Sequence, residues 1–301
     1  MFFERILEGV RLAPARRVAV AAAAGRSVLE ALTEARDQGI ARPLFFGDAA
    51  RIEAEARTAG FAISPDEIAD CPDPHEALVS AVATVREGRC GVLLKGKVPT
   101  PEFLRAVLDR ERGLRGPGLL THMAAFELDA LDRPLFLTDS GLVATPDLAQ
   151  KEAILREGLR FLHGLGYARP KVAILAASEE PDPRIPASRD AVALVERAAG
   201  DAFGAADIAG PYALDLAISP TAAALKGVVS PVAGRADLLL CPDVVAGNLL
   251  GKSMLYLAGA RAAGLVLGAT APVVMLSRAD SPEARLRSLS LAIAWDQALR
   301  P

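Results

Sequence analysis

The residues best suited to chemistry lie in the segment 271–289, near the carboxyl end of the chain. The apolar run from Pro272 to Leu276 is expected to form a buried strand, and a polar loop with Ser277 and Arg278 follows it. A guanidinium offers forked donors that match phosphate oxygens, so this loop could bind phosphate. An ordinary strand-to-helix connection with a solvated arginine is the simpler interpretation of the same residues.

A well-marked helix start follows this loop. Ser281 is a good N-cap, Pro282 suits the first helical position, and Glu283 adds a carboxylate to the first turn. The unpaired N–H groups of such a helix end can bind an anion. We therefore expect Ser281 to contribute to a phosphate site.

A second loop has a similar layout. The strand expected over Cys90 to Leu94 is followed by Lys95, Gly96 and Lys97, and then by a helix from Pro101. Ligands bind beyond the carboxyl ends of the strands in open parallel sheets, so Lys95 and Gly96 are candidate phosphate ligands. Solvated surface lysines are an equally good interpretation.

Polar residues also interrupt or follow other apolar strands. Thr121 and His122 stand in an apolar strand, where a hydrogen-bonded histidine of the core or rim is the commoner role. Asp139 and Ser140 follow a strand, where a ligand contact and an Asx turn are both plausible.

The second half of the chain adds turn residues close to a strand and a helix. Ser230 precedes the strand expected over Asp237 to Cys241, and Gly247, Asn248 and Lys252 open the helix that comes after it. A Gly-Asn pair at a helix start can expose backbone N–H groups, although such residues also merely mark turns.

Strands and helices alternate along almost the whole chain. Apolar residues at helical spacing predict an amphipathic first helix over residues 2–10. Apolar strands are expected at residues 17–24, 43–46, 90–94, 118–128, 133–138, 171–176, 207–209, 237–241, 265–267 and 272–276. The alternation predicts an α/β fold with mostly parallel sheets covered by helices on both faces. A domain seam is expected near residues 138–146.

Composition narrows the function classes. The 301 residues suffice for two domains, and a net charge of −3 gives no electrostatic case for binding nucleic acid or an acidic membrane. Three widely spaced cysteines without a CxxC motif predict no metal site. The odd cysteine count, the lack of a secretory leader and the lack of a membrane-length apolar run favour the cytoplasm. The Walker, GxGxxG, GxSxG and HExxH motifs are absent.

Longer stretches resemble a known family. SPVAGRADLLLCPDVVAGNLLGKS and GATAPVVMLSRADS resemble the phosphate acetyltransferase/phosphate butyryltransferase family. LLKGKVPTPEFLRAVLD, GLLTHMAAFELDALDRPLFLTDSGLVATPDLAQK, PKVAIL and GPYALDLAIS look like that family in the same order. The LTHMAAFE and LTDS stretches are nearer the butyryltransferase branch. The resemblance covers nearly the whole chain.

The resemblance implies a fold and an activity. The fold would be two three-layer α/β domains with mostly parallel sheets and an interdomain cleft, like isocitrate and isopropylmalate dehydrogenases. Residues 1–140 with 269–301 would form the first domain and residues 141–268 the second, usually in a homodimer. The activity would be reversible acyl transfer between coenzyme A and inorganic phosphate, by direct attack in a ternary complex. Coenzyme A would be a substrate, and no cofactor would be covalently bound.

The resemblance also assigns roles to residues. Ser277 and Arg278 match the catalytic Ser-Arg pair. The acetyltransferase branch has a proposed aspartate base where this chain has Ala284, which leaves the adjacent Glu283 as the candidate base, with Asp280 as a second choice. An asparagine usual in both branches is Val143 here. The expected site comprises catalytic Ser277, Arg278 and Glu283, the phosphate or acyl-phosphate ligands Lys95, Gly96, Thr121, His122, Asp139, Ser230 and Ser281, and the coenzyme A or cleft residues Gly247, Asn248 and Lys252.

Two alternative functions stay open at this point. One is a metal- and NAD-dependent decarboxylating dehydrogenase of the same architecture, which would need a cluster of acidic metal ligands. The other is a non-catalytic regulator that binds coenzyme A. The preferred acyl chain is not given by the sequence, because pocket depth depends on packing.

Overall fold

The computed structural model describes residues 1–23, 25–275 and 280–300. The chain forms two compact units, Met1–Pro117 with Ala263–Pro301 and Gly118–Ala262. The division thus falls at 117/118 and 262/263, not at the expected 140/141 and 268/269. The segment 121–138 belongs to the second unit because its two strands pair with each other and the later one pairs with the strand Leu238–Leu240.

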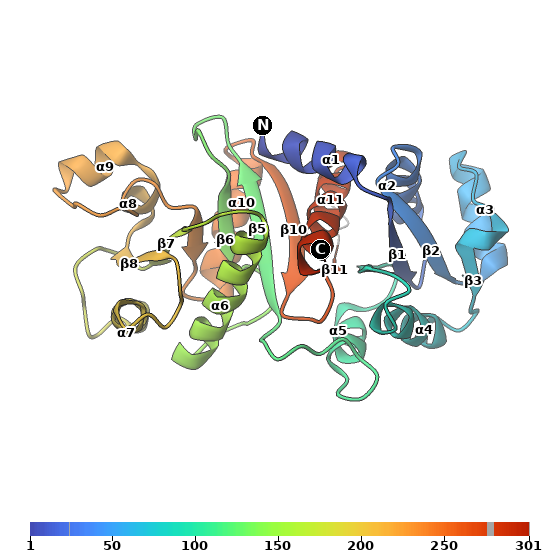
Figure 1. Cartoon of the computed structure of the whole chain (residues 1–301), viewed down its shortest axis with the longest axis horizontal. Helices are drawn as coiled ribbons and strands as arrows, with labels where there is room; N and C mark the ends of the chain where they lie inside the picture. The colour runs from blue at the N-terminus through green and yellow to red at the C-terminus, as the bar shows by residue number, and fades with distance from the viewer. Residues whose placement is uncertain (24, 276–279, 301) are drawn as a thin grey trace. The chain divides into compact units, whose positions relative to one another are not determined.

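The first unit is a sheet between two layers of helices (Figure 1). Its strands are β1 (Arg16–Ala21), β2 (Ala41–Gly47), β3 (Ile68–Asp70), β4 (Val92–Lys95), β10 (Arg261–Leu267) and β11 (Val273–Val274), in the order β3-β2-β1-β4-β11-β10. Its helices are α1 (Phe2–Leu12), α2 (Arg26–Asp37), α3 (Ala49–Ala59), α4 (Pro74–Arg86), α5 (Thr100–Leu108) and α11 (Pro282–Leu299). β10 is antiparallel to β11, and the other pairs are parallel.

The second unit repeats the pattern. Its strands are β5 (Thr121–Glu127), β6 (Leu135–Thr138), β7 (Lys171–Leu175), β8 (Asp207–Tyr212) and β9 (Leu238–Leu240), in the order β5-β6-β9-β7-β8. Its helices are α6 (Leu148–Gly164), α7 (Pro186–Ala199), α8 (Leu214–Ile218), α9 (Pro220–Leu225) and α10 (Val244–Tyr256). Only β5 runs antiparallel to its neighbour in this set, so the expected mostly parallel α/β architecture is confirmed.

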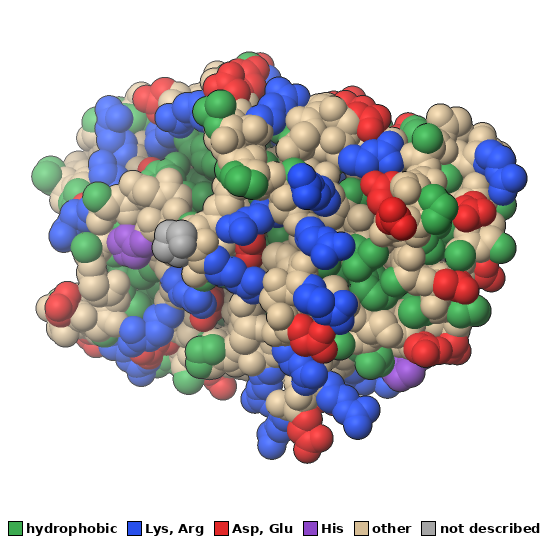
Figure 2. Space-filling view, turned by 45° about the vertical axis from the view of Figure 1, so that its right-hand side comes forward, with side chains coloured by type: hydrophobic (Ala, Val, Ile, Leu, Met, Phe, Trp, Pro, Cys, Tyr) green, Lys and Arg blue, Asp and Glu red, His purple; other side chains and the backbone are tan. Residues whose placement is uncertain are grey.

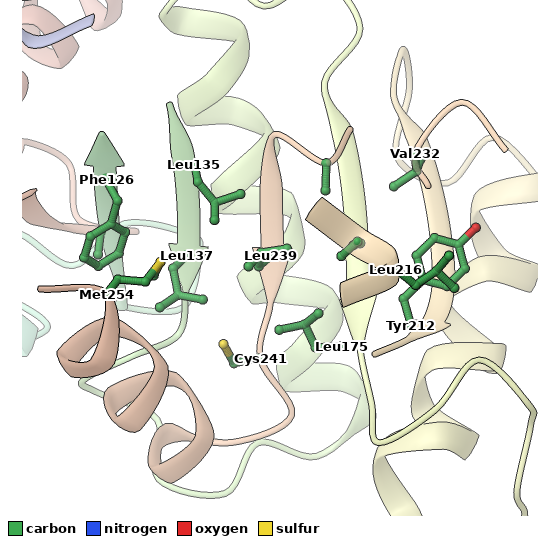
Figure 3. Packing of buried hydrophobic residues seen from close by; sticks show 14 of the residues in the cluster. Phe126, Leu135, Leu137, Leu175, Tyr212, Leu216, Val232, Leu239, Cys241 and Met254 are labelled. Atoms are coloured by element: carbon green, nitrogen blue, oxygen red, sulfur yellow. The ribbon is translucent and has the colours of Figure 1, made fainter. Parts of the chain in front are cut away.

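Buried apolar residues hold each sheet to its helices. In the second unit, Phe126, Leu137 and Leu239 project from the strands toward Met254 of α10 and Leu216 of α8 (Figure 3). Burying a side chain of this size stabilises the fold by about 1.5–3 kcal/mol. In the described part of the chain, no helix is long and apolar enough to cross a membrane.

Most helices begin at side chains that cap them. Each cap accepts a hydrogen bond from the backbone N–H three residues on, which satisfies one donor of the first turn. These caps are Asp48 for α3, Asp73 for α4, Asp147 for α6, Ser219 for α9, Asp243 for α10 and Ser281 for α11.

Local features of the chain set the ends of two helices near the site. The helix expected from Pro101 is α5, which stops at Leu108 because the Asp109 carboxylate accepts the N–H groups of Glu111 and Arg112 and turns the chain. The helix expected around Gly247, Asn248 and Lys252 is α10, which stops at Tyr256. Gly259 then takes a positive φ of 64°, and the chain enters β10 at Arg261.

Candidate functional site

In the second unit, polar groups gather where β6 ends. The carboxylate of Asp139, only 2% exposed, accepts the backbone N–H groups of Gly141, Leu142 and Val143 at 2.7–3.1 Å. It also accepts the hydroxyl of Thr121 at 3.1 Å. These bonds form the Asx turn that was one of the two interpretations of this aspartate. Val143 contributes its backbone N–H to this turn.

The start of β5 completes this cluster. β5 and β6 pair antiparallel with Ala124 opposite Leu137, so the first residues of β5 lie beside the residues just after β6. The Thr121 hydroxyl is 3.0 Å from the hydroxyl of Thr138, and His122 Nδ1 is 2.8 Å from Ser140 Oγ. His122 is half-buried, which agrees with the hydrogen-bonded rim histidine considered above.

The first turns of α10 pack directly on this cluster. A Cβ added at Gly247 would lie 2.3 Å from the carbonyl oxygen of Asp139 and 2.9 Å from Ser140 Cα, so only glycine fits there. The Asn248 side-chain amide donates to the carbonyl of Ser140 at 3.4 Å. Two of the three expected cleft residues therefore touch the loop after β6.

Ser230 and Lys252 make other contacts. Ser230 Oγ accepts the N–H of Val232 in the loop before β9. Lys252 is exposed, and its ammonium lies 5.6 Å from the centre of the Tyr256 ring in a cation–π contact. Their predicted ligand roles stay predictions.

A buried cysteine lies beside the cluster but is unsuited to nucleophilic chemistry. The backbone N–H of Cys241 donates to the carbonyl of Thr138 at 2.7 Å. Burial, followed by the charges of Asp139 and Asp243, raises the pKa of the Cys241 thiol far above its usual range. The thiol is therefore neutral and acts as part of the core.

In the first unit, Lys95 and Gly96 lie where β4 ends. β4 pairs in parallel with both β1 and β11, and Leu94 is level with Val274. Half-buried Lys95 is therefore level with Met275, the residue that precedes the segment 276–279. Gly96 is required by packing, because a Cβ there would lie 2.4 Å from the carbonyl oxygen of Ala22.

The catalytic pair predicted at Ser277 and Arg278 lies outside the described residues. The chain is described again from Asp280, and the predicted cap is confirmed, since Ser281 Oγ accepts the N–H of Ala284 at 3.2 Å. The same hydroxyl hydrogen-bonds the carboxylate of Glu283 and lowers its pKa. Glu283 is therefore ionised at neutral pH, and a lowered pKa makes it a weaker base.

The site residues are thus divided between the units, and each unit presents polar groups at the carboxyl ends of its strands. Sequence reasoning missed Thr138 and the amides of residues 141–143, although an Asp-Ser-Gly sequence after a strand is a recognisable turn signal. No group of His, Cys, Asp and Glu in the described ranges could hold a metal ion. The face in Figure 2 mixes blue Lys and Arg with red Asp and Glu side chains.

The chain is similar to known proteins along most of its length. A family model described as phosphate acetyl/butaryl transferase matches residues 73–293. A phosphate butyryltransferase of Clostridium acetobutylicum is 37% identical over 290 residues, which cover 96% of each chain. A phosphate acetyltransferase of Thermotoga maritima is 35% identical over 295 residues, covering 98% of this chain and 100% of its own.

Solved structures have the same architecture. A branched-chain phosphotransacylase from Enterococcus faecalis V583 superposes with a TM-score of 0.82 at 29% identity, covering 93% of this chain and 99% of its own. A 4-hydroxythreonine-4-phosphate dehydrogenase from Klebsiella pneumoniae gives 0.57 at 14% identity, covering 94% and 100%. This second likeness extends to the fold alone and agrees with the dehydrogenase-like architecture expected from the sequence.

Proposed function

The chain belongs to the phosphate acetyl/butyryl transferase family, and from that premise we propose that it transfers a short acyl group reversibly between coenzyme A and inorganic phosphate. The observation that carries this proposal is the match of residues 73–293 to the family model, with relatives at 35% and 37% identity along nearly the whole chain. The chain is therefore an acyltransferase enzyme, with acyl-CoA and phosphate as substrates and coenzyme A and an acyl phosphate as products.

The proposed reaction is a direct attack. A phosphate oxygen forms a bond to the thioester carbonyl carbon, the carbon–sulfur bond breaks, and coenzyme A leaves as a thiolate that takes up a proton. Holding the two substrates together removes much of the entropic barrier. We assign phosphate binding to Arg278, Lys95 and the helix start at Ser281, and stabilisation of the carbonyl oxygen to the Ser277 hydroxyl.

In the second unit, we assign substrate contacts to the cluster around Asp139. The four hydrogen bonds to Asp139 fix the loop, and the His122–Ser140 pair supplies polar groups at its edge. The imidazole of His122 and the hydroxyl of Ser140 can donate hydrogen bonds to phosphate or acyl-phosphate oxygens. Asn248 and Lys252 of α10 are assigned to coenzyme A.

The reverse reaction needs a proton acceptor for the coenzyme A thiol. Glu283 is our first candidate because it follows the N-cap of α11, and Asp280 is the second. The lowered pKa of Glu283 keeps its carboxylate charged but limits its strength as a base. Its contribution is therefore expected to be partly electrostatic.

The test is a panel of acyl-CoAs from acetyl to branched five-carbon chains, with free thiol measured with and without phosphate. Phosphate-dependent thiol release together with acyl phosphate formation supports the proposal. Coenzyme A binding without phosphate-dependent release would support the regulator instead, and nicotinamide reduction with a hydroxy-acid substrate would support the dehydrogenase.

We also propose a homodimer in the cytoplasm. The dimer follows from the family resemblance and predicts a particle of twice the 31.4 kDa chain mass in sedimentation equilibrium, where a monomer would contradict it. Cys71, Cys90 and Cys241 are free thiols in the structure, which fits a reducing compartment.

A further inference from the structure

A pocket of about 240 Å³ opens at the carboxyl edge of the first unit's sheet. Its walls come from the residues that follow β1, β2, β3 and β4, with one side from α3. The apolar lining consists of Ala22, Ala23, Ile52, Pro72 and Pro74. The volume is below the roughly 300–1,000 Å³ of pockets for drug-sized ligands, so the pocket suits one compact ligand unit.

The pocket walls are held by backbone hydrogen bonds that extend the strand pairing. The N–H of Ala23 donates to Phe46 at 2.8 Å, that of Cys71 to Gly47 at 2.9 Å, and that of Lys97 to Ala22 at 2.8 Å. A side chain at Gly47 would press on Ile52, since its Cβ would lie 3.2 Å from Ile52 Cδ1. The pocket is therefore built into the sheet edge and needs no rearrangement to exist.

Three charged side chains line the pocket, and they differ in sign. Asp48 follows β2 directly and caps α3 with one carboxylate oxygen, which accepts the N–H of Arg51. Arg51 is half-exposed and pairs with Glu55 on its own helix. Lys97 is exposed, and in the described part of the chain its ammonium takes part in no hydrogen bond or ion pair. The Asp48 carboxylate can accept hydrogen bonds from ligand hydroxyl groups, and the Arg51 and Lys97 side chains can bind an anion.

The position of the pocket in the sheet indicates which kind of ligand carries both hydroxyl groups and an anionic group. The order β3-β2-β1-β4 reverses direction between β1 and β4, and such switch points are where doubly wound sheets bind nucleotides. In that arrangement an acidic residue after the second strand binds ribose hydroxyls, which is the position of Asp48. The GxGxxG motif is missing, but the small side chains of Ala22 and Ala23 leave space for a ligand close to the backbone after β1.

We propose that this pocket binds one nucleoside phosphate unit. The base packs against the apolar wall, the ribose hydroxyls donate to Asp48, and the phosphate lies beside Lys97 and Arg51. A free adenine nucleotide and the nucleotide end of coenzyme A share this chemistry. Coenzyme A as the source of this nucleotide unit rests on the proposed function, whereas binding of a free nucleotide does not.

Alkylation of Cys71 can report whether the pocket is occupied. It is the partly exposed cysteine of the pocket wall, while Cys90 and Cys241 are 1% and 2% exposed. Because burial raises the pKa of the Cys71 thiol, alkylation by N-ethylmaleimide is best followed at one fixed, mildly alkaline pH. The variant Cys71→Ala shows how much of the label belongs to this site.

The experiment compares the alkylation rate of the full chain with five probes. These are AMP, adenosine 3′,5′-bisphosphate, S-methyl-coenzyme A, S-methyl-pantetheine and inorganic phosphate. We expect the three nucleotide-containing probes to slow Cys71 alkylation at least fivefold at saturation, and the other two to leave it unchanged. Lower half-protecting concentrations for S-methyl-coenzyme A and adenosine 3′,5′-bisphosphate than for AMP identify coenzyme A as the source, and a half-protecting concentration of AMP equal to or below theirs identifies a free nucleotide.

Matched variants test the chemistry of recognition. Asp48→Asn keeps a capping side chain for α3 but removes the charge, and Lys97→Ala removes the ammonium. Each is expected to raise the half-protecting concentration about tenfold, the effect of losing one charged hydrogen bond. Arg57→Ala, an exposed change on the last turn of α3, should leave that concentration unchanged.

Three results would overturn the proposal: no protection by any nucleotide, equal protection by S-methyl-pantetheine or phosphate, or nucleotide protection unaffected by both pocket variants. Each of these leaves phosphate-dependent thiol release untouched. Loss of that release with nucleotide protection retained would instead refute the proposed function and keep the pocket.

Discussion

At the scale of single residues, Asp139 is the polar group on which the second unit's cluster depends. Its carboxylate is almost fully buried and is balanced by three backbone N–H groups and the Thr121 hydroxyl. A buried carboxylate is tolerated only with such a full set of donors. Replacing an acceptor with a donor would leave some of those N–H groups unpaired.

Asp139→Asn is accordingly expected to destabilise the fold by about 1–3 kcal/mol, the cost of leaving buried donors unsatisfied. Urea unfolding measures this change. The control Asp132→Asn removes an acid that is 77% exposed and pairs with Arg133, and it should shift stability by less than about 0.5 kcal/mol. Equal stability of the two variants would show that the Asp139 carboxylate does not hold the loop.

Ser277→Ala should reduce turnover by about 10²–10³ if the hydroxyl stabilises the developing oxyanion. Steady-state kinetics with acyl-CoA and phosphate measure this turnover.

Arg278→Lys should reduce activity mainly by weakening the interaction with phosphate, because a point charge does not replace the forked guanidinium. Turnover and a phosphate Michaelis constant close to those of the unaltered enzyme would remove both residues from the mechanism.

At the scale of elements, helix starts and strand ends bring the polar groups together. α10 begins on the loop after β6 because Gly247 allows its backbone to approach the carbonyl of Asp139. α11 begins after its cap Ser281 and carries Asp296 in its last turn, where the buried carboxylate lies 3.2 Å from Arg16 Nε and 3.5 Å from Arg300 Nε. Each helix therefore depends on one close contact that its sequence pattern does not reveal.

Gly247→Ala should force α10 away from the loop, because the new Cβ would lie 2.3 Å from a backbone oxygen. We expect a loss of about 1–3 kcal/mol in stability, the usual cost of overpacking, and reduced turnover. Gly251→Ala in the same helix is the control, since its Cβ would meet Phe126 at an ordinary 3.4 Å. That change should be neutral or stabilising by about 0.5–1 kcal/mol. A stable, fully active Gly247→Ala enzyme would contradict the packing argument.

Asp296 predicts a pH dependence of stability. Burial raises its pKa above the unfolded value, while Arg300 and Arg16 oppose that rise. A raised carboxyl pKa contributes stability that is fully present below the unfolded pKa and is lost as pH rises through the folded pKa. Between about pH 4 and 7, the stability of Asp296→Asn relative to the unaltered protein should therefore increase with pH. Urea midpoints at several pH values measure this, and a pH-independent difference would contradict the assignment.

Sequence reasoning predicted the alternation of elements, the cap at Ser281 and the polar groups at strand ends, because those depend on local pattern. The missed features depend on contacts between distant segments. The start of β5 meets the residues after β6 only through antiparallel register, and the close approach of Gly247 exists only in the folded chain. The pocket beside Lys97 likewise needs four strand ends in one place.

At the scale of the whole molecule, each unit places polar groups at the carboxyl ends of its strands, the region where open α/β sheets bind ligands. The division at 117/118 and 262/263 assigns the Lys95 loop and Ser281 to one unit and the Asp139 cluster to the other. The match of residues 73–293 shows membership of the acyltransferase family, and we propose that both sets of groups bind phosphate or acyl-CoA.

The most direct test of this account is the release of free thiol from butyryl-CoA as a function of phosphate concentration, with acyl phosphate measured in the same samples. We predict release that saturates with phosphate and an equal amount of acyl phosphate formed. Thiol release that proceeds at the same rate without phosphate, or no release at all with bound acyl-CoA, would contradict the central claim.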